Sequence, residues 1–408
     1  MDFADSARSV DLQLRTRSFL DEVVYPAEPV YEAQADANRA AGTPFTTPAI
    51  IAELAAEARR RGLWNLFLPD ERFGAGLTTS EYAPIAELSG RAPQLAPEVM
   101  NCAAPDTGNM ELLAMFGTDE QQDRWLRPLL DGRIRSCFSM TEPDVASSDA
   151  TNIATRIERD GADYVVTGEK WWSTGALRPE CRVAIVMGVS HPDAERHRRH
   201  SMVLVPLDAA GVTVRRSTTV FGYDDGPHGG HGGIDFNHVR VPAANLLGAE
   251  GAGFAMAQAR LGPGRVHHCM RVLGTAERAL AMMCQRAADR TAFGRPLAEQ
   301  GVIRGWIAES RLALDQARLL VLKTAWLIDT VGVGDATTEI AAIKVAAPRA
   351  AGAVLERAIQ VFGARGVSGD TPLAQWWAGV RALRLADGPD EVHLRSVART
   401  ELRRQEDS

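Results

Sequence analysis

The sequence predicts an α+β chain in which a helical domain, a β domain and a second helical domain follow one another. Three observations lead to this expectation. Apolar residues recur at helical spacing through residues 1–134, β-branched runs separated by turn residues fill 135–250, and helical spacing returns in 251–408. The chain is long enough for several cores, so we expect domain boundaries near residues 134 and 250.

Start and stop signals define the helices expected in the first segment. One helix should end before Pro26, and a second should have Thr47 as its N-cap and Pro48 in its first turn. A shorter helix should end near Gly90, and the last should be capped by Thr118 and begin with acidic residues. This segment should therefore be all-α.

Turn residues divide the second segment into short strands. Asp160-Gly161 indicates a hairpin, and the charged stretch His191–His200 should be a solvated loop between two strands. The glycine-rich stretch Gly222–Gly233 carries His228 and His231, and it either shapes a pocket or is a flexible loop. These histidines lack the spacing of a metal site, so no metal is expected.

Helices in the third segment are apolar on more than one face. Such helices are buried by other helices or by another subunit, which predicts a four-helix-type domain and self-association. Gly262–Gly264 should form a kink or a weak point in the first of these helices.

Composition and charge exclude several classes of protein. The 408 residues include 45% hydrophobic residues and carry a net charge of −7, so a basic surface for nucleic acid is not expected. The five cysteines form no CxxC pair, which favours a reducing, cytoplasmic compartment. The first residues lack the apolar stretch of a secretory signal, and no uncharged run of 18 apolar residues would span a membrane.

Two stretches in the second segment carry residues suited to a ligand. The polar loop Ser139–Thr151 could bind an oxyanion, a phosphate or a polar ring edge, or it could be a turn capped by Thr141. Gly168–Ala176 places two tryptophans beside two hydroxyl residues, which suits a flat aromatic ligand or, alternatively, a core tryptophan at a strand end.

Two stretches in the third segment follow helix ends. Arg290 offers a forked donor for pyrophosphate and Phe293 a stacking surface, although a helix-end salt bridge and a buried ring would also explain them. Gly363 and Gly366 follow a helix and not a strand, so they are typical of a C-cap and not of a dinucleotide fingerprint.

The motifs, in their order, resemble those of the acyl-CoA dehydrogenase family over nearly the whole chain. The stretches MTEPDVASSDA, KWWSTG, RTAFG and QVFG resemble its cofactor motifs. GYDDGPHG, GPGRVHHCMR and LRLADGPDEVH further resemble a branch whose animal members include fusions to a kinase-like module. The resemblance implies an N-terminal helical domain, a middle β-barrel-like domain and a C-terminal four-helix bundle, with FAD between the last two.

The resemblance also implies roles for individual residues. Trp172 would cover the flavin ring, Ser173 and Thr174 would bond its polar edge, and Arg290 would hold the pyrophosphate. Ser148 and Arg265 would meet the acyl-CoA. The other residues implied at the cofactor, some of them reaching a neighbouring subunit's FAD, are Phe138, Met140, Thr141, Ser148, Phe293, Gln300, Gln360, Gly363, Ala364 and Glu391. Ala364 stands where family members usually carry a second glycine.

Asp387 is the expected catalytic base. It resembles the family's glutamate in position and in its spacing from Gln360, but here the motif reads Asp-Gly-Pro in place of Glu-Gly-Thr. The alternative base position of some members is Gly264, which carries no carboxylate. Aspartate is one methylene shorter, so its carboxylate retreats by roughly 1.5 Å unless the backbone or the substrate shifts. Asp390 and Glu391 are the other nearby acids.

The implied activity is the α,β-dehydrogenation of an acyl-CoA, with electrons passed to an electron-transfer flavoprotein by a homodimer or homotetramer. One alternative keeps the fold and FAD but acts as an oxidase or monooxygenase, because relatives that oxidise nitroalkanes also use an aspartate base. A non-enzymatic, DNA-binding protein is a third possibility, and the acidic net charge argues against it.

Overall fold

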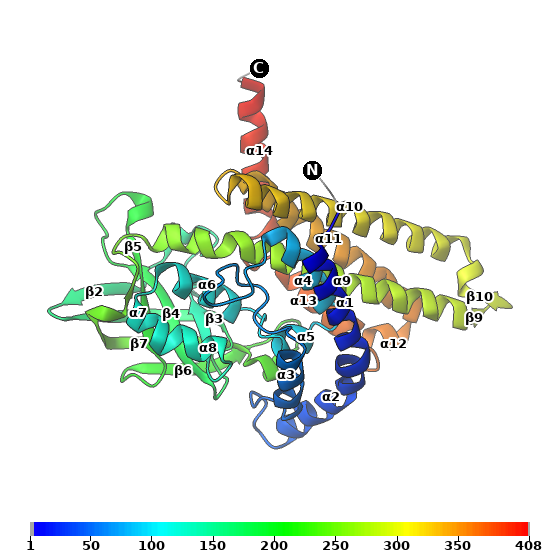
Figure 1. The fold of residues 1–408 in the computed structure, drawn as a ribbon, viewed down its shortest axis with the longest axis horizontal. Helices are drawn as coiled ribbons and strands as arrows, with labels where there is room; N and C mark the ends of the chain where they lie inside the picture. The colour runs from blue at the N-terminus through cyan, green and yellow to red at the C-terminus, as the bar shows by residue number, and fades with distance from the viewer. Residues whose placement is uncertain (1–3, 407–408) are drawn as a thin grey trace. The chain divides into compact units, whose positions relative to one another are not determined.

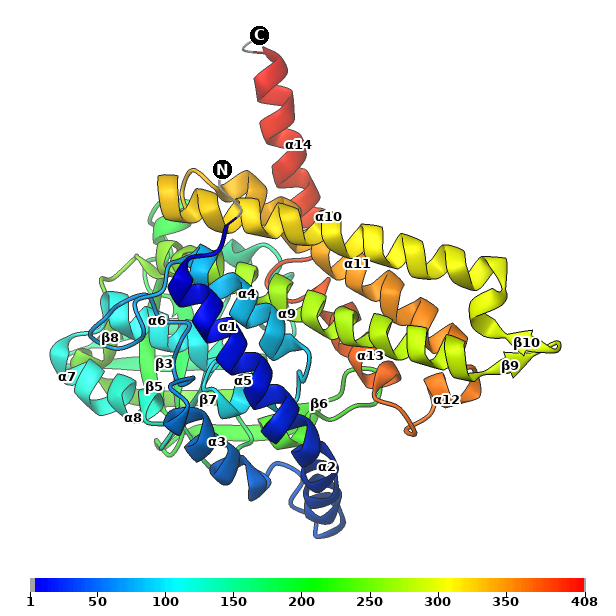
Figure 2. The same cartoon turned by 45° about the vertical axis from the view of Figure 1, so that its right-hand side comes forward.

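The computed structural model describes residues 4–406, and its contacts divide the chain into two compact units (Figures 1 and 2). The helical unit comprises Met1–Tyr25, Leu77–Pro97 and Gly262–Ser408, and the sheet unit comprises Pro26–Gly76 and Glu98–Leu261. Each unit therefore combines segments that are distant in the sequence.

The sheet unit is built on one eight-stranded mixed sheet with the order β6-β7-β3-β2-β4-β5-β8, in which β1 pairs with β4 in parallel. The strands are β1 Arg135–Ser139, β2 Arg156–Asp160, β3 Asp163–Thr174, β4 Cys181–Val189, β5 His200–Pro206, β6 Val212–Thr218, β7 His231–Pro242 and β8 Leu246–Leu247. The expected hairpin joins β2 to β3 at Gly161, whose φ of 61° suits the turn. Inward side chains such as Val166, Val186 and Val203 form the core.

Short helices accompany this sheet. They are α2 Tyr25–Ala40, α3 Ile50–Arg60, α5 Ala96–Val99, α6 Asp106–Phe116, α7 Asp119–Gln121 and α8 Arg127–Leu130, with a π-turn at Gln122–Leu126. Thr118 caps α7 through a complete capping box, as expected. Thr47 does not cap α3, which was a wrong prediction, because its hydroxyl instead accepts hydrogen bonds from Arg178.

The helical unit is built from helices of 4 to 37 residues, the longest of which begins in the sheet unit. They are α1 Ala7–Phe19, α4 Thr79–Gly90, α9 Gly253–Asp289, α10 Gly301–Val331, α11 Thr337–Phe362, α12 Ala364–Val367, α13 Leu373–Leu383 and α14 Asp390–Glu406, with a small hairpin of β9 Thr291–Ala292 and β10 Arg295–Pro296. Helices α10 and α11 run alongside each other, and α14 projects from the group (Figures 1 and 2). A Cβ on Gly274 would lie 1.8 Å from the Glu87 carbonyl oxygen, so glycine lets α9 and α4 pack closely.

One expected helix break is absent from the described residues. The first helix does not end before Pro26, because a π-turn at Leu20–Val24 joins α1 directly to α2. Gly262–Gly264 lies within the continuous α9. Among residues 4–406, no helix is long and apolar enough to cross a bilayer.

Candidate active site

A buried ion pair fixes the polar loop that follows β1. The Lys170 ammonium on β3 donates to the Glu142 carboxylate and to the Met140 carbonyl oxygen, each at 2.8 Å. The same carboxylate accepts from the backbone N–H groups of Ala154 and Thr155 at 2.7 and 2.9 Å. Glu142 therefore joins both ends of the loop to the sheet.

Burial and pairing oppose each other in this ion pair. Burial lowers the pKa of Lys170 to about 8, and Glu142 limits the fall. Burial would raise the pKa of Glu142, but Lys170 and the hydrogen bonds outweigh it, so that pKa is lowered. No sequence motif marks this pair, although a lysine at an inward position of an alternating strand is a visible signal.

The end of β3 turns one tryptophan toward solvent. Trp172 has a φ of 52°, its side chain is 36% exposed, and the β3–β7 register shifts between Lys170 and Ser173. The backbone N–H of Trp171 donates to the Thr141 carbonyl oxygen at 3.0 Å, which ties this bulge to the polar loop. The exposed Trp172 indole is thus presented by a fixed backbone.

Ser173 and Thr174 face opposite sides of the strand. Ser173 is fully buried and its hydroxyl lies 2.9 Å from the Ser139 hydroxyl, so it points into the unit. The Thr174 hydroxyl lies 3.0 Å from Nδ1 of His231. Of the two hydroxyls expected at the flavin edge, only the Thr174 hydroxyl contacts His231. The Trp172 ring also lies near His231, with 5.1 Å between the two ring centres.

The remaining expected cofactor residues of the sheet unit lie on β1 or in the polar loop that follows it. Phe138 on β1 is partly buried, and the Arg260 guanidinium lies 4.2 Å from its ring centre. Met140 and Thr141 are partly buried, whereas Ser148 is exposed in the loop.

Exposed residues gather at one end of the helical unit. The β9–β10 hairpin lies at one end of the unit (Figures 1 and 2). It carries Phe293, which is 99% exposed at a φ of 53° and follows the exposed Arg290 closely in the sequence. Gln300 precedes α10 and accepts from Arg295 at 3.1 Å. Gln360 and Ala364 are also exposed on either side of Gly363, whose φ of 64° ends α11.

Asp387 lies in the turn between α13 and α14, and its main chain is held on one side. Its carbonyl oxygen lies 3.2 Å from the Arg265 guanidinium and 3.2 Å from Nε2 of His393. Its carboxylate lies 3.5 Å from Nε2 of His268, and the side chain is 23% exposed. Asp387 and Gly388 have φ values of 55° and 101°, so two successive residues adopt left-handed backbone.

Two buried cations, Arg265 and Lys344, lie beside Asp387. Lys344 is fully buried and its ammonium contacts the carbonyl oxygens of Leu383 and Gly388. Burial lowers the pKa values of Lys344 and Arg265, and the Asp387 carboxylate opposes both shifts. Burial, reinforced by Arg265 and Lys344, lowers the pKa of His393 to about 4, so this ring is neutral at pH 7. Glu391, by contrast, is exposed in the first turn of α14.

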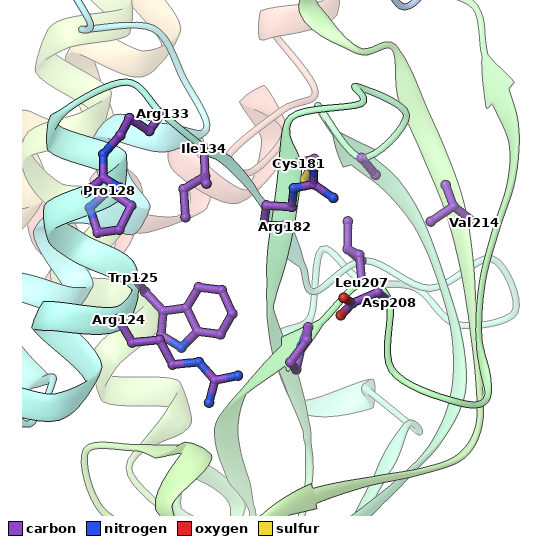
Figure 3. A pocket seen from close by; sticks show the side chains of 12 residues that line it. Arg124, Trp125, Pro128, Arg133, Ile134, Cys181, Arg182, Leu207, Asp208 and Val214 are labelled. Carbon is purple, nitrogen blue, oxygen red and sulfur yellow. The ribbon is translucent and has the colours of Figure 1, made fainter.

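One cavity of about 500 Å³ lies elsewhere in the sheet unit (Figure 3). Arg124 and Trp125 face Arg182, Leu207 and Asp208 across it. Its described lining includes none of the residues expected at the site, so we assign it no role. Across residues 4–406, no group of histidine, cysteine and acidic side chains is placed to hold a metal ion.

Comparisons with known proteins match every segment of the chain. Residues 8–133, 137–239 and 251–402 match the N-terminal, middle and C-terminal domain models of acyl-CoA dehydrogenase. A Mycobacterium tuberculosis protein named as the probable acyl-CoA dehydrogenase FadE2 is 60% identical over 99% of this chain and 98% of its own length. Acyl-CoA dehydrogenase family member 11 of Rattus norvegicus is 51% identical over 99% of the chain, which spans about half (51%) of that relative.

Solved structures share the fold. A Mycobacterium abscessus protein assigned as an acyl-CoA dehydrogenase is 52% identical with a TM-score of 0.96, over 99% of this chain and 100% of that one. The glutaryl-CoA dehydrogenase of Mycobacterium smegmatis in complex with FADH2 is 23% identical with a TM-score of 0.80, over 97% and 94%. These matches confirm the resemblance carried by the motifs and the predicted fold class.

Proposed function

Because the chain belongs to the acyl-CoA dehydrogenase family, we propose that it is an FAD-dependent enzyme that oxidises an acyl-CoA thioester to the trans-2-enoyl thioester. The observation that carries this reaction is the Asp387 carboxylate, set beside Arg265, Lys344 and His268 in a partly buried turn. An electron-transfer flavoprotein is the proposed electron acceptor, and the three segments 1–134, 135–250 and 251–408 are the proposed domains.

The residues of the sheet unit fit a flavin. An exposed indole on a fixed bulge offers a flat surface, and the Thr174 hydroxyl beside it offers a polar contact. The buried indole N–H of Trp171 has no acceptor among the described residues, so a polar group is wanted close to this loop. When bound, FAD supplies the acceptor for the two electrons removed from the substrate.

The cofactor would be held from more than one direction. Phe138, Met140, Thr141 and Ser148 would bind it from the sheet unit together with Trp172 and Thr174. Arg290 would hold the pyrophosphate as a forked donor. The exposed residues of the helical unit, namely Phe293, Gln360, Gly363, Ala364 and Glu391, would reach the FAD of a second copy in a homodimer or homotetramer, together with the partly buried Gln300. The exposure of Phe293 and Gln360 supports this part of the proposal.

Asp387 would take the α-proton of the substrate, with Ser148 and Arg265 near the acyl-CoA. Proton abstraction needs an ionised carboxylate, and the nearby cations favour that form. The left-handed backbone at Asp387 and Gly388, with the Asp387 carbonyl held by Arg265 and His393, sets where the side chain departs. We propose that this turn brings the shorter carboxylate forward and so replaces the missing methylene.

The test is the variant Asp387→Asn, purified with its FAD. It should retain the yellow cofactor, because no proposed FAD contact is lost, while bleaching of the flavin by acyl-CoA under anaerobic conditions slows by at least about 100-fold. His191→Leu, a change on the exposed β4–β5 loop, should bleach like the wild type. Bleaching of Asp387→Asn at a near wild-type rate would show that Asp387 is not the base.

The aspartate base keeps an oxidase or monooxygenase in consideration as a second function. With acyl-CoA and air but no other acceptor, a dehydrogenase should consume little oxygen. Rapid oxygen uptake with release of hydrogen peroxide would favour the oxidase instead, and oxidation of a nitroalkane would identify its substrate class.

A further inference from the structure

The glycine-rich loop before β7 is built against the end of β3. The Gly175 N–H donates to the Gly230 carbonyl oxygen at 2.9 Å, and the Leu177 N–H donates to that of Gly229 at 3.1 Å. A Cβ on Gly229 would lie 2.8 Å from the Gly175 carbonyl oxygen, so this close approach requires glycine. Main-chain hydrogen bonds and this close approach therefore hold the loop behind Thr174.

This loop places a carboxylate and two imidazoles in a row that ends at Thr174. The Asp225 carboxylate lies 2.8 Å from Nδ1 of His228 and, through its other oxygen, 3.9 Å from Nε2 of His231. Nδ1 of His231 lies 3.0 Å from the Thr174 hydroxyl, and Thr174 and His231 are paired residues of β3 and β7. The His231 backbone is fixed in turn, because its N–H donates to the Ser217 hydroxyl at 3.0 Å.

The charges in this row favour a neutral His231. Burial would lower the pKa of His228, but Asp225 outweighs it and the pKa is raised, so the charged pair is Asp225 with His228. Burial lowers the pKa of His231, and the attraction of Asp225 does not compensate for it, while His228 adds to the fall. A neutral imidazole carries one N–H. On Nε2 this N–H faces the carboxylate, and Nδ1 is then an acceptor for the Thr174 hydroxyl.

We propose that His231 is a positioning residue that makes Thr174 a hydrogen-bond donor to the imidazole and thereby an acceptor toward the flavin edge. Oxidised flavin presents an acceptor nitrogen at that edge, whereas reduced flavin presents an N–H. A Thr174 oxygen that accepts would stabilise the reduced form and raise the reduction potential of the bound cofactor. This inference rests on the proposed placement of FAD against Trp172 and Thr174.

The measurement is the midpoint potential of the bound FAD, without substrate, in the wild type and in His231→Leu. Loss of the acceptor should free the Thr174 hydroxyl to donate to oxidised flavin. The preference for reduced over oxidised FAD should then fall roughly tenfold, which is about 30 mV toward more negative potential for a two-electron couple. His191→Leu, on the exposed β4–β5 loop of the same unit, should leave the potential unchanged.

A double-mutant cycle shows whether the effect passes through Thr174. In the Thr174→Val background, His231→Leu should produce no further shift. An unchanged potential in His231→Leu, a shift toward positive values, or an equal shift in both backgrounds would each overturn the proposal. If His231→Leu does not retain FAD, Asp225→Asn is the second variant. Its midpoint potential should shift less but with the same sign. An unchanged potential in Asp225→Asn would then also overturn the proposal.

The same measurements separate this inference from the proposed function. If Thr174→Val leaves the potential and the absorption spectrum unchanged, Thr174 does not meet the flavin edge, and the inference fails with that placement. If Asp387→Asn still reduces its flavin, the proposed base is wrong, but the potentials of the His231 variants retain their meaning because no substrate is present.

Discussion

In the sheet unit, hydrogen bonds to neighbouring segments hold the residues that are proposed to meet FAD. Trp172 stands on a bulge tied to the Thr141 carbonyl, and the Thr174 hydroxyl contacts His231. In the helical unit, Asp387 is held by its carbonyl oxygen, and its carboxylate lies 3.5 Å from Nε2 of His268. The difference matches two tasks, because a cofactor needs a fixed surface, whereas a base must move a proton and needs some freedom.

The two halves also differ in how their charges are compensated. Lys170 is buried against one carboxylate and one carbonyl oxygen. Lys344 is equally buried, but its ammonium contacts the carbonyl oxygens of the turn that carries Asp387. We therefore expect removal of the Lys170 charge to lower the stability of the sheet unit. Removal of the Lys344 charge should instead change the shape of the turn in the helical unit.

The largest loss of stability should follow from Lys170→Met in the sheet half. It leaves the Glu142 carboxylate buried beside two backbone donors without its cation, and breaking a buried pair from one side costs about 3–5 kcal/mol. Urea unfolding measures the free energy, and FAD titration reports on the loop. Lys323→Met is the matched control, because the exposed Lys323 lies 3.7 Å from Glu339 and its loss should cost at most about 1 kcal/mol.

A double variant sharpens this prediction. Lys170→Met combined with Glu142→Gln removes the unpaired charge and should recover a large part of the lost stability. If the single variant is as stable as Lys323→Met, the ion pair does not anchor the loop.

Acidification should act on the helical half through His393. Its pKa is about 4 in the folded chain and ordinarily 6.5, so the unfolded chain binds a proton over this range that the folded chain does not. The stability contributed by the neutral ring is therefore present above pH 6.5 and is lost as the pH falls toward 4. Between pH 7 and 4.5, the free energy of unfolding of the wild type should fall by about 2–3 kcal/mol more than that of His393→Gln. Urea titrations of both chains at both pH values measure this difference. An equal fall in the free energy of unfolding of the two chains would contradict the prediction.

Local signals in the sequence predicted local structure well. The Asp160-Gly161 hairpin and the Thr118 capping box depend on neighbouring residues, and both are present. One wrong prediction involves a distant partner, because Thr47 binds Arg178, which lies 131 residues along the chain. Pro26 did not end its helix, since a π-turn absorbs the disruption.

The same contrast between local and distant signals holds for the residues of the proposed site. Motif resemblance drew attention to Trp172, Thr174 and Asp387, yet it gave no sign of the residues that hold them. Thr174 meets His231 through the register of β3 with β7, and Lys170 of β3 meets Glu142 in the loop after β1. A single sequence does not determine either pairing. Physical supports of this kind become visible only when strands are paired.

The smallest effect should come from Gly388→Ala, which tests whether the turn itself positions Asp387. Gly388 has a φ of 101°, and an added Cβ would lie 2.9 Å from Nε2 of His393, so either the backbone or the imidazole must shift. We expect a loss of about 1–3 kcal/mol in unfolding free energy and a slower anaerobic bleaching of FAD by acyl-CoA. Gly379→Ala on α13 is the control, because its Cβ meets no described atom within 4 Å and helix propensity should raise stability by up to about 1 kcal/mol. A Gly388→Ala chain that is destabilised but bleaches at the wild-type rate would show that the left-handed turn serves stability alone. In that case the shorter carboxylate must reach the substrate by another route, and the contrast between a fixed cofactor surface and a backbone-positioned base would not hold.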